Sequence, residues 1–124
     1  MSAEISKEQI KAGETIFKEG DSDSHFYIIE EGRVGIFIQK DGLQVKLSEF
    51  GPGESFGEFA LLDKAPRSAT ALALTDVEVF KVTEKGFEEM MAQLPDWASC
   101  MLKNFVVRLK KMNTRLKELP QFIV

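Results

Sequence analysis

The segment GPGESFGEFALLDKAPRSAT, residues 51–70, decides the fold of this chain. It lies between two runs of apolar and β-branched residues that read as strands, and it is long for a loop in so small a domain. Gly57 frees the backbone for a close approach to a ligand, and residues 58–62 are expected to form one short helical turn. Because the first N–H groups of such a turn have no intrahelical partner, they offer an anion site.

The second half of this segment adds a charged donor and a hydroxyl. Pro66 fixes the approach of Arg67, and Ser68 follows directly. A guanidinium supplies positive charge and a planar fork, while a hydroxyl supplies a neutral donor, and together they suit a phosphate. Glu58 would repel a phosphate, but its carboxylate suits a sugar hydroxyl beside the anion. The alternative is that Glu58 and Arg67 pair with each other and close the loop.

Residues 13–82 are predicted to form short strands separated by turns. Asp41-Gly42 is a strong hairpin signal, because both residues tolerate positive φ. Strands this short and regular indicate a sandwich or a rolled barrel. A short helix is expected before them, at about residues 6–12. The expected strands cover residues 16–17, 26–29, 34–38, 45–50, 69–74 and 77–82.

The period changes to that of helices after Val82. Thr83 is a suitable N-cap for a first helix, Pro95 interrupts it, and Asp96 opens a second helix that is expected to run to about Leu119. The second helix carries a 3.5-residue apolar repeat that favours a seam with another helix, as in a homodimer. The alternative is that this stripe packs on the chain's own strands. Its members are Ala98, Leu102, Phe105, Leu109, Met112, Leu116 and Leu119.

Composition excludes several classes of function. The 124 residues suit one domain, residues 1–124, and the net charge of −4 without a basic face argues against nucleic acid as a partner. No segment resembles a signal peptide or a membrane span, and Cys100 is the only cysteine, so we expect a cytoplasmic protein. His25 is the only histidine, which excludes a metal site built on several imidazoles; we expect it to be an edge residue. The chain shows no catalytic set, so an enzyme is not expected.

Residues 57–70 resemble the phosphate-binding cassette of the cyclic-nucleotide-binding domain family, which includes bacterial catabolite activator proteins, protein kinase A regulatory subunits and cyclic-nucleotide-gated channels. The matching residues are GEFALL at 57–62 and PRSAT at 66–70; residues 13–21, 26–34 and 51–57 look like the family's opening strands and cassette entry. The resemblance spans about residues 10–119. It implies a mainly β fold, a β-roll (a double-stranded, jelly-roll-like β-helix) at about residues 13–82, with a short N-terminal helix and a long C-terminal lid helix.

The resemblance also implies a ligand, cAMP or cGMP, and a role for each cassette residue. The residue matching Glu58 takes the ribose 2′-hydroxyl, and the one matching Arg67 neutralises the cyclic phosphate. Ser68 and Ala69 match positions that donate to the phosphate through side chain and backbone. The cradle is completed by the backbone of Gly57 and the nearby amides of Phe59 and Ala60.

The base is specified less closely. Leu47 and Phe56 are expected to make apolar contacts beside the sugar or base. On the lid helix, Asn113 could pair with an adenine edge because a carboxamide both donates and accepts, and the alternative is an exposed helix residue. Ser68 does not settle cAMP against cGMP.

The sequence therefore predicts a regulatory binding module whose C-terminal helix reports occupancy to a second subunit or a neighbouring domain. Two other functions stay open. One is a truncated transcription factor of the catabolite activator type, which would need a DNA-reading domain after the lid helix. The other is a structural or dimerisation module that no longer binds nucleotide.

Overall fold

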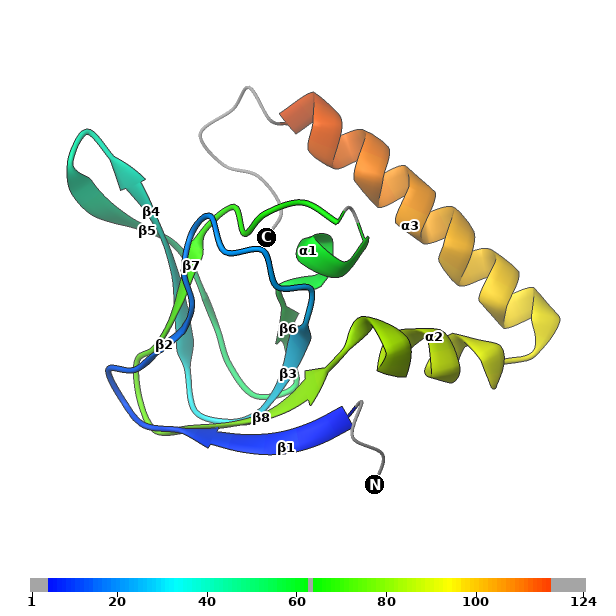
Figure 1. The fold of residues 1–124 in the computed structure, drawn as a ribbon, viewed down its shortest axis with the longest axis horizontal. Coiled ribbons are helices and arrows are strands. Elements are labelled where there is room, and N and C mark those ends of the chain that lie inside the picture. Colours follow the sequence, from blue (N-terminus) through cyan, green and yellow to red (C-terminus); the bar gives the residue numbers. More distant parts are fainter. Residues whose placement is uncertain (1–4, 63, 117–124) are drawn as a thin grey trace.

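A computed structural model describes residues 5–62 and 64–116, with only the backbone of residues 62 and 113–116. The described residues form eight strands in two antiparallel four-stranded sheets that face each other as a β-roll (Figure 1), with strand orders β1-β8-β3-β6 and β2-β7-β4-β5. The predicted mainly β fold is confirmed. The strands are β1 (Ile5–Ile10), β2 (Thr15–Phe17), β3 (Phe26–Glu31), β4 (Val34–Lys40), β5 (Leu43–Phe50), β6 (Ser55–Phe56), β7 (Thr70–Ala73) and β8 (Val77–Val82).

The hairpin between β4 and β5 turns where the sequence predicted it. Asp41 and Gly42 have φ values of 54° and 77°, so both lie in the left-handed region that a tight hairpin of this twist requires. Lys40 pairs with Leu43 next to the turn, and Val34 pairs with Phe50 at the other end of the ladder.

The predicted N-terminal helix is wrong. Residues 5–10 form β1, which pairs antiparallel with β8 from Ile5 opposite Val82 to Ile10 opposite Val77. Lys, Glu and Gln in this segment favour a helix locally, but the backbone hydrogen bonds offered by the edge of β8 outweigh that small preference. The β-roll therefore begins before residue 13.

The core lies between the two sheets. Alternate residues of a strand point to one face, so Val34 and Ile36 on β4 and Val77 and Val79 on β8 all reach it. Aromatic rings fill its centre, where Phe56 stacks on Tyr27 with ring centroids 5.2 Å apart. The buried members of this core are Phe17, Tyr27, Ile29, Val34, Ile36, Phe56, Ala69, Ala71, Ala73, Val77 and Val79.

In the part of the chain that the structure describes, three helices accompany the roll: α1 (Glu58–Leu62), α2 (Glu84–Ala92) and α3 (Asp96–Leu116). The Thr83 hydroxyl accepts a hydrogen bond from the N–H of Gly86 at 3.1 Å, which confirms it as the N-cap of α2. Residues 117–119, the expected end of the last helix, lie outside the described residues. Within the described part, no helix is long and apolar enough to cross a membrane.

Candidate functional site

The site is built on the segment from Gly57 to Thr70, called the cassette below. Gly57 has φ +83°, and a Cβ placed there would lie 2.8 Å from Nη1 of Arg67, so no larger residue fits without displacing that side chain. The expected helical turn follows at once as α1. Glycine is therefore needed here both for its backbone conformation and for its small size.

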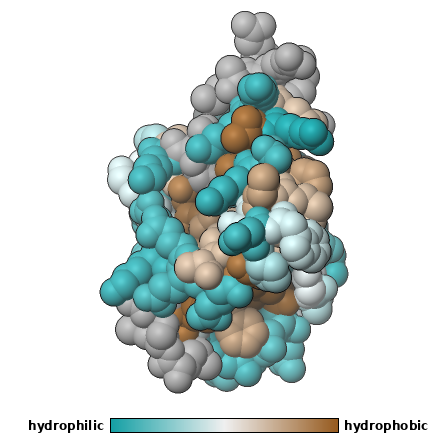
Figure 2. Space-filling model, turned by 90° about the vertical axis from the view of Figure 1, so that its right-hand side faces the viewer, coloured by the Kyte–Doolittle hydropathy of each residue, from teal (hydrophilic) through white to brown (hydrophobic). Residues whose placement is uncertain are grey.

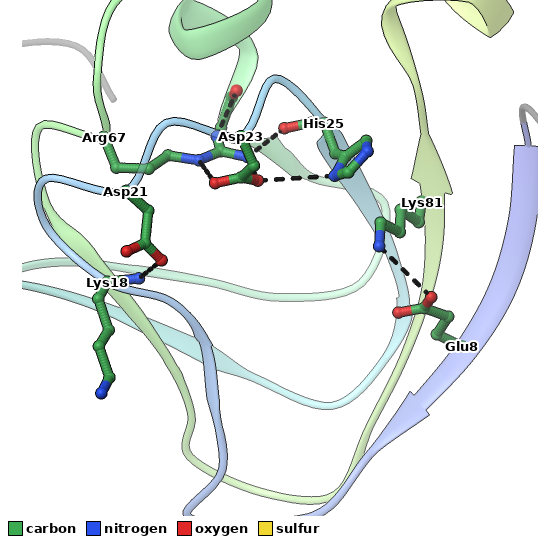
Figure 3. A network of polar contacts seen from close by, with 8 residues as sticks. Glu8, Lys18, Asp21, Asp23, His25, Arg67 and Lys81 are labelled. Carbon is green, nitrogen blue, oxygen red and sulfur yellow. Dashed lines mark hydrogen bonds and ion pairs between the residues drawn. The ribbon is translucent and has the colours of Figure 1, made fainter.

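Arg67 is buried and fixed by hydrogen bonds on several sides (Figure 3). Its Nε and Nη2 donate to the two carboxylate oxygens of Asp23, the first at 3.0 Å. Its Nη1 donates to the carbonyl of Gly57 at 2.9 Å, and Nη2 also donates to the carbonyl of His25. The guanidinium carbon lies 3.9 Å from the ring centroid of Phe17, which supports it from below. The result is a rigid, preoriented cation.

The backbone around Arg67 is anchored to the turn that precedes β3. The N–H of Arg67 donates to the carbonyl of Asp21, and the N–H of Gly20 donates to the carbonyl of Arg67, both at 2.8 Å. The hydroxyl of Thr70 accepts from the N–H of Glu19 at 3.0 Å. These three bonds hold the second half of the cassette although it lies about fifty residues from that turn in the sequence.

Glu58 is half-buried at the start of α1 and is not paired with Arg67. The hydroxyl of Ser55 donates to Oε1 of Glu58. Because Arg67 has Asp23 as its counter-ion, the alternative in which Glu58 and Arg67 close the loop is not the arrangement found. The Glu58 carboxylate keeps acceptor capacity beyond the single bond from Ser55.

The other predicted site residues differ in exposure. Ser68 and Leu47 are half-buried, so part of each side chain reaches solvent. Asn113 lies on the backbone of α3, and its side chain is outside the described residues. Four others are buried, namely Phe56, Phe59, Ala60 and Ala69. Phe56 is a central core ring, and neither Phe56 nor Ala69 has exposed surface in this structure.

Asp23 and His25 lie beside Arg67 and have shifted pKa values. Burial, the largest influence, would raise the pKa of Asp23, but the hydrogen bonds and charge of Arg67 and the charge of His25 outweigh it and leave that pKa below its ordinary value. Burial, followed by the charge of Lys81, lowers the pKa of His25. The His25 ring nitrogen Nδ1 lies 3.6 Å from Asp23. His25 directly precedes β3, which begins at Phe26, and its carbonyl also belongs to the site.

Asp23 was missed by sequence reasoning. It lies 44 residues before Arg67, in a run of alternating Asp and Ser that reads only as a polar turn. The signal that could have found it is the need of a buried arginine for a counter-ion, which points to an acid near the cassette but not to the position of that acid.

Helices α2 and α3 line an apolar pocket of about 490 Å³. Phe87, Met91 and Ala92 line it from α2, and Val106 and Lys103 line it from α3. The face that α3 presents carries apolar side chains among hydrophilic ones (Figure 2).

The apolar stripe of α3 is left uncovered by the described part of the chain. Its members Leu102, Phe105, Leu109 and Met112 are 37–51% exposed. The half-buried positions of α3 are instead Ala98, Ser99, Val106 and Lys110, most of which lie on a neighbouring face of the helix. The stripe is therefore not used to pack α3 on the chain's own strands.

Comparison with known proteins gives one consistent result. The family model for the cyclic nucleotide-binding domain matches residues 7–94. The cAMP-dependent protein kinase regulatory subunit of Aspergillus niger is 40% identical over 85 residues, which are 68% of this chain and 20% of that protein. The CRP-like cAMP-activated global transcriptional regulator of Mycobacterium tuberculosis is 31% identical over 108 residues, 86% of this chain and 48% of that protein. The chain thus spans less than half the length of these relatives.

Among solved structures, the halfsite-occupied form of the EAL enzyme Bd1971 matches with a TM-score of 0.81 at 36% identity, covering 87% of this chain and 97% of that one. Longer chains of the same enzyme, of which the match covers 30%, have been solved in cAMP-bound and cGMP-bound forms, with TM-scores of 0.68 and 0.70.

Proposed function

The chain belongs to the cyclic nucleotide-binding domain family, and on that premise we propose that it is a regulatory sensor that binds cAMP, with cGMP as the second candidate. The observation that carries the proposal is the buried, preoriented Arg67 at the end of the cassette. cAMP is placed first because both curated relatives described above are named for cAMP. Bd1971 has also been solved in a cGMP-bound form, and cGMP is therefore the alternative ligand.

The cyclic phosphate is assigned to Arg67 and the groups around it. Its guanidinium supplies the charge, and the half-buried Ser68 supplies a hydroxyl donor. The amide of Ala69 and the amides at Gly57, Phe59 and Ala60 complete the cradle. No catalytic step is required of this arrangement, since its hydrogen-bond donors only have to hold an anion.

The ribose is assigned to Glu58. Its carboxylate accepts from Ser55 and has capacity for a further hydroxyl donor. A carboxylate is an acceptor-only group, so it distinguishes a free 2′-hydroxyl from a sugar that lacks one. Leu47 and the lid residue Asn113 are the assigned contacts of the base, and the buried ring of Phe56 shapes the floor beneath the cassette.

Occupancy is transmitted through a small apolar cluster that joins the cassette to α2. Leu61 of α1 is buried there with Phe26 and Val82, and Phe87 of α2 packs against the same cluster. Any movement of α1 on nucleotide binding therefore changes the packing of Phe87. Because α3 follows α2 directly, the long helix amplifies a small displacement of α2.

We assign the exposed stripe of α3 to a second copy of the chain. Four neighbouring apolar side chains at 3.5-residue spacing are costly to leave in water, and that spacing suits two helices packed side by side. In this reading the homodimer is the output that cyclic nucleotide binding modulates. A dimerisation module without nucleotide is the second candidate function, because the stripe alone would support it.

The test is calorimetric titration of nucleotide-free chain with cAMP, cGMP and, as the matched control, 5′-AMP. We expect saturable binding of cAMP at one site per chain, weaker binding of cGMP and none of 5′-AMP, because its open phosphate carries a second negative charge that the single cation Arg67 does not neutralise. If the chain binds neither cyclic nucleotide, the proposed sensor is wrong and the dimerisation module takes its place.

A further inference from the structure

The pairing of Arg67 has a consequence for any anion that binds there. A guanidinium has five N–H donors. Two of those of Arg67 go to Asp23, one to the carbonyl of Gly57 and one to the carbonyl of His25, which leaves a single N–H on Nη1 without a partner among the described residues. Bidentate recognition of a phosphate needs two neighbouring N–H groups. One existing bond must therefore be released when a phosphate takes a fork of Arg67.

Asp23 is the partner that can leave most easily. The carbonyls of Gly57 and His25 are fixed in the backbone beneath the cassette, and losing Arg67 would leave them without this donor in a buried place. The Asp23 side chain is 29% exposed, so water can solvate its carboxylate once it turns away. Asp23 also occupies the Nε–Nη2 fork, which is a position that a bidentate phosphate would take.

The electrostatic balance points the same way. Arg67 and Asp23 form a neutral pair, so an arriving phosphate meets no net charge from them until Asp23 withdraws. The titratable side chains of His25 and Tyr27 also lie close to the pair, and the nearby Lys81 is paired with Glu8. None of these supplies a second buried cation to replace Arg67.

We propose that Asp23 is an internal competitor for the phosphate: it holds Arg67 in the nucleotide-free chain and sets the affinity by the free energy needed to displace it. This inference rests on the proposed function, since it names what regulates the same site. A ligand shifts an equilibrium only by its differential interaction with two states, and here the free state contains the Asp23–Arg67 bonds that the bound state gives up. Residue 23 therefore tunes the working range of the sensor without touching the nucleotide.

The test compares Asp23→Asn with Asp21→Asn by calorimetric titration with cAMP. Asn keeps an acceptor for one N–H of Arg67 but removes the competing charge, so Asp23→Asn is expected to bind cAMP about tenfold more tightly than wild type. Asp21 lies in the same loop, and its carboxylate accepts from the N–H of Lys18 rather than from Arg67. Asp21→Asn should change the affinity by less than about twofold, because exposed charges act weakly at a distance.

Asp23→Ser is the second variant, in case the amide prevents folding, because Ser22 and Ser24 show that serine suits this loop. Equal affinity of wild type and the Asp23 variants would overturn the inference while leaving the proposed function intact. Weaker binding by the variants would also overturn it and make Asp23 a positioning residue for Arg67. If neither wild type nor any variant binds cAMP, the proposed function fails, and this inference fails with it.

Discussion

Phe26 of β3 and Phe87 of α2 meet edge to face, with ring centroids 6.0 Å apart and ring planes at 82°. This contact attaches α2 to the roll at the place where Leu61 of the cassette is also buried. The two rings thus join the roll to α2, which is followed by the long helix α3.

Phe87→Ala should uncouple α3 from the cassette. Removing the ring deletes the contact of α2 with Phe26. The cassette itself is unchanged, so cAMP should still bind within about threefold of wild type. The response of Trp97, the only tryptophan, which lies exposed at the start of α3, should however be lost. The measurement is the change in Trp97 fluorescence on adding cAMP.

The control for that experiment is Phe80→Ala, a matched deletion on β8 outside this cluster, where the Phe80 ring lies under Lys7. It should keep the fluorescence response. An undiminished response in Phe87→Ala would show that the signal does not pass through this contact.

Glu58→Gln should lower the affinity for cAMP by about tenfold, because a charge-assisted hydrogen bond to the ribose hydroxyl becomes a neutral one. The same change should leave the affinity for 2′-deoxy-cAMP unaltered, since that ligand lacks the hydroxyl. Titration of wild type and Glu58→Gln with both ligands separates the loss of the ribose hydrogen bond from a general effect on the cassette. Glu54→Gln removes an equal charge four residues earlier and should alter neither affinity. An equal loss for both ligands would mean that Glu58 supports the fold of the cassette instead.

His25 should make the nucleotide-free chain less stable in mild acid. Its pKa is lowered in the folded chain by burial and by Lys81, so below its ordinary value of 6.5 the unfolded chain takes up the proton more readily. Stability is then lost as the pH falls from about 7.5 toward 5.5. Because no other histidine is present, His25→Gln should flatten this slope in urea unfolding. Identical slopes for wild type and His25→Gln would show that His25 does not cause the loss of stability in acid.

Leu109→Glu should weaken self-association through α3. A charge in the centre of the apolar stripe is incompatible with a helix–helix seam. The mass measured by light scattering should fall toward that of one chain. Asn104→Glu, on the same helix but outside the stripe, is the control and should leave the mass unchanged. If Leu109→Glu keeps the wild-type mass, the stripe serves a contact other than a second copy.

Local signals in the sequence predicted the parts of the fold that local chemistry determines. Asp41-Gly42 requires positive φ, Thr83 caps α2, and Pro95 separates α2 from α3. The strand β1 was mistaken for a helix because its residue types favour one, whereas its structure depends on pairing with β8, more than sixty residues away. Such pairing leaves no trace in the segment itself.

The candidate site, like the fold, could be predicted only in part from the sequence. Gly57, Glu58 and Arg67 could be identified because they lie close together in one recognisable segment. Their partners could not, since Ser55 and Asp23 contact them through side-chain geometry that only the folded chain defines. The burial of Arg67 and its hydrogen bonds to the carbonyls of Gly57 and His25 likewise could not be predicted from the sequence.

The central claim is that Arg67 holds the cyclic phosphate, and the most direct test is titration of Arg67→Lys with cAMP beside wild type. Lysine keeps the charge but loses the planar fork, so we predict binding weaker by about tenfold to a hundredfold. Arg33→Lys is the control, because Arg33 lies outside the cassette and pairs with Glu49 at the surface, so this change should leave the affinity unchanged. Equal affinity of Arg67→Lys and wild type for cAMP would contradict the account.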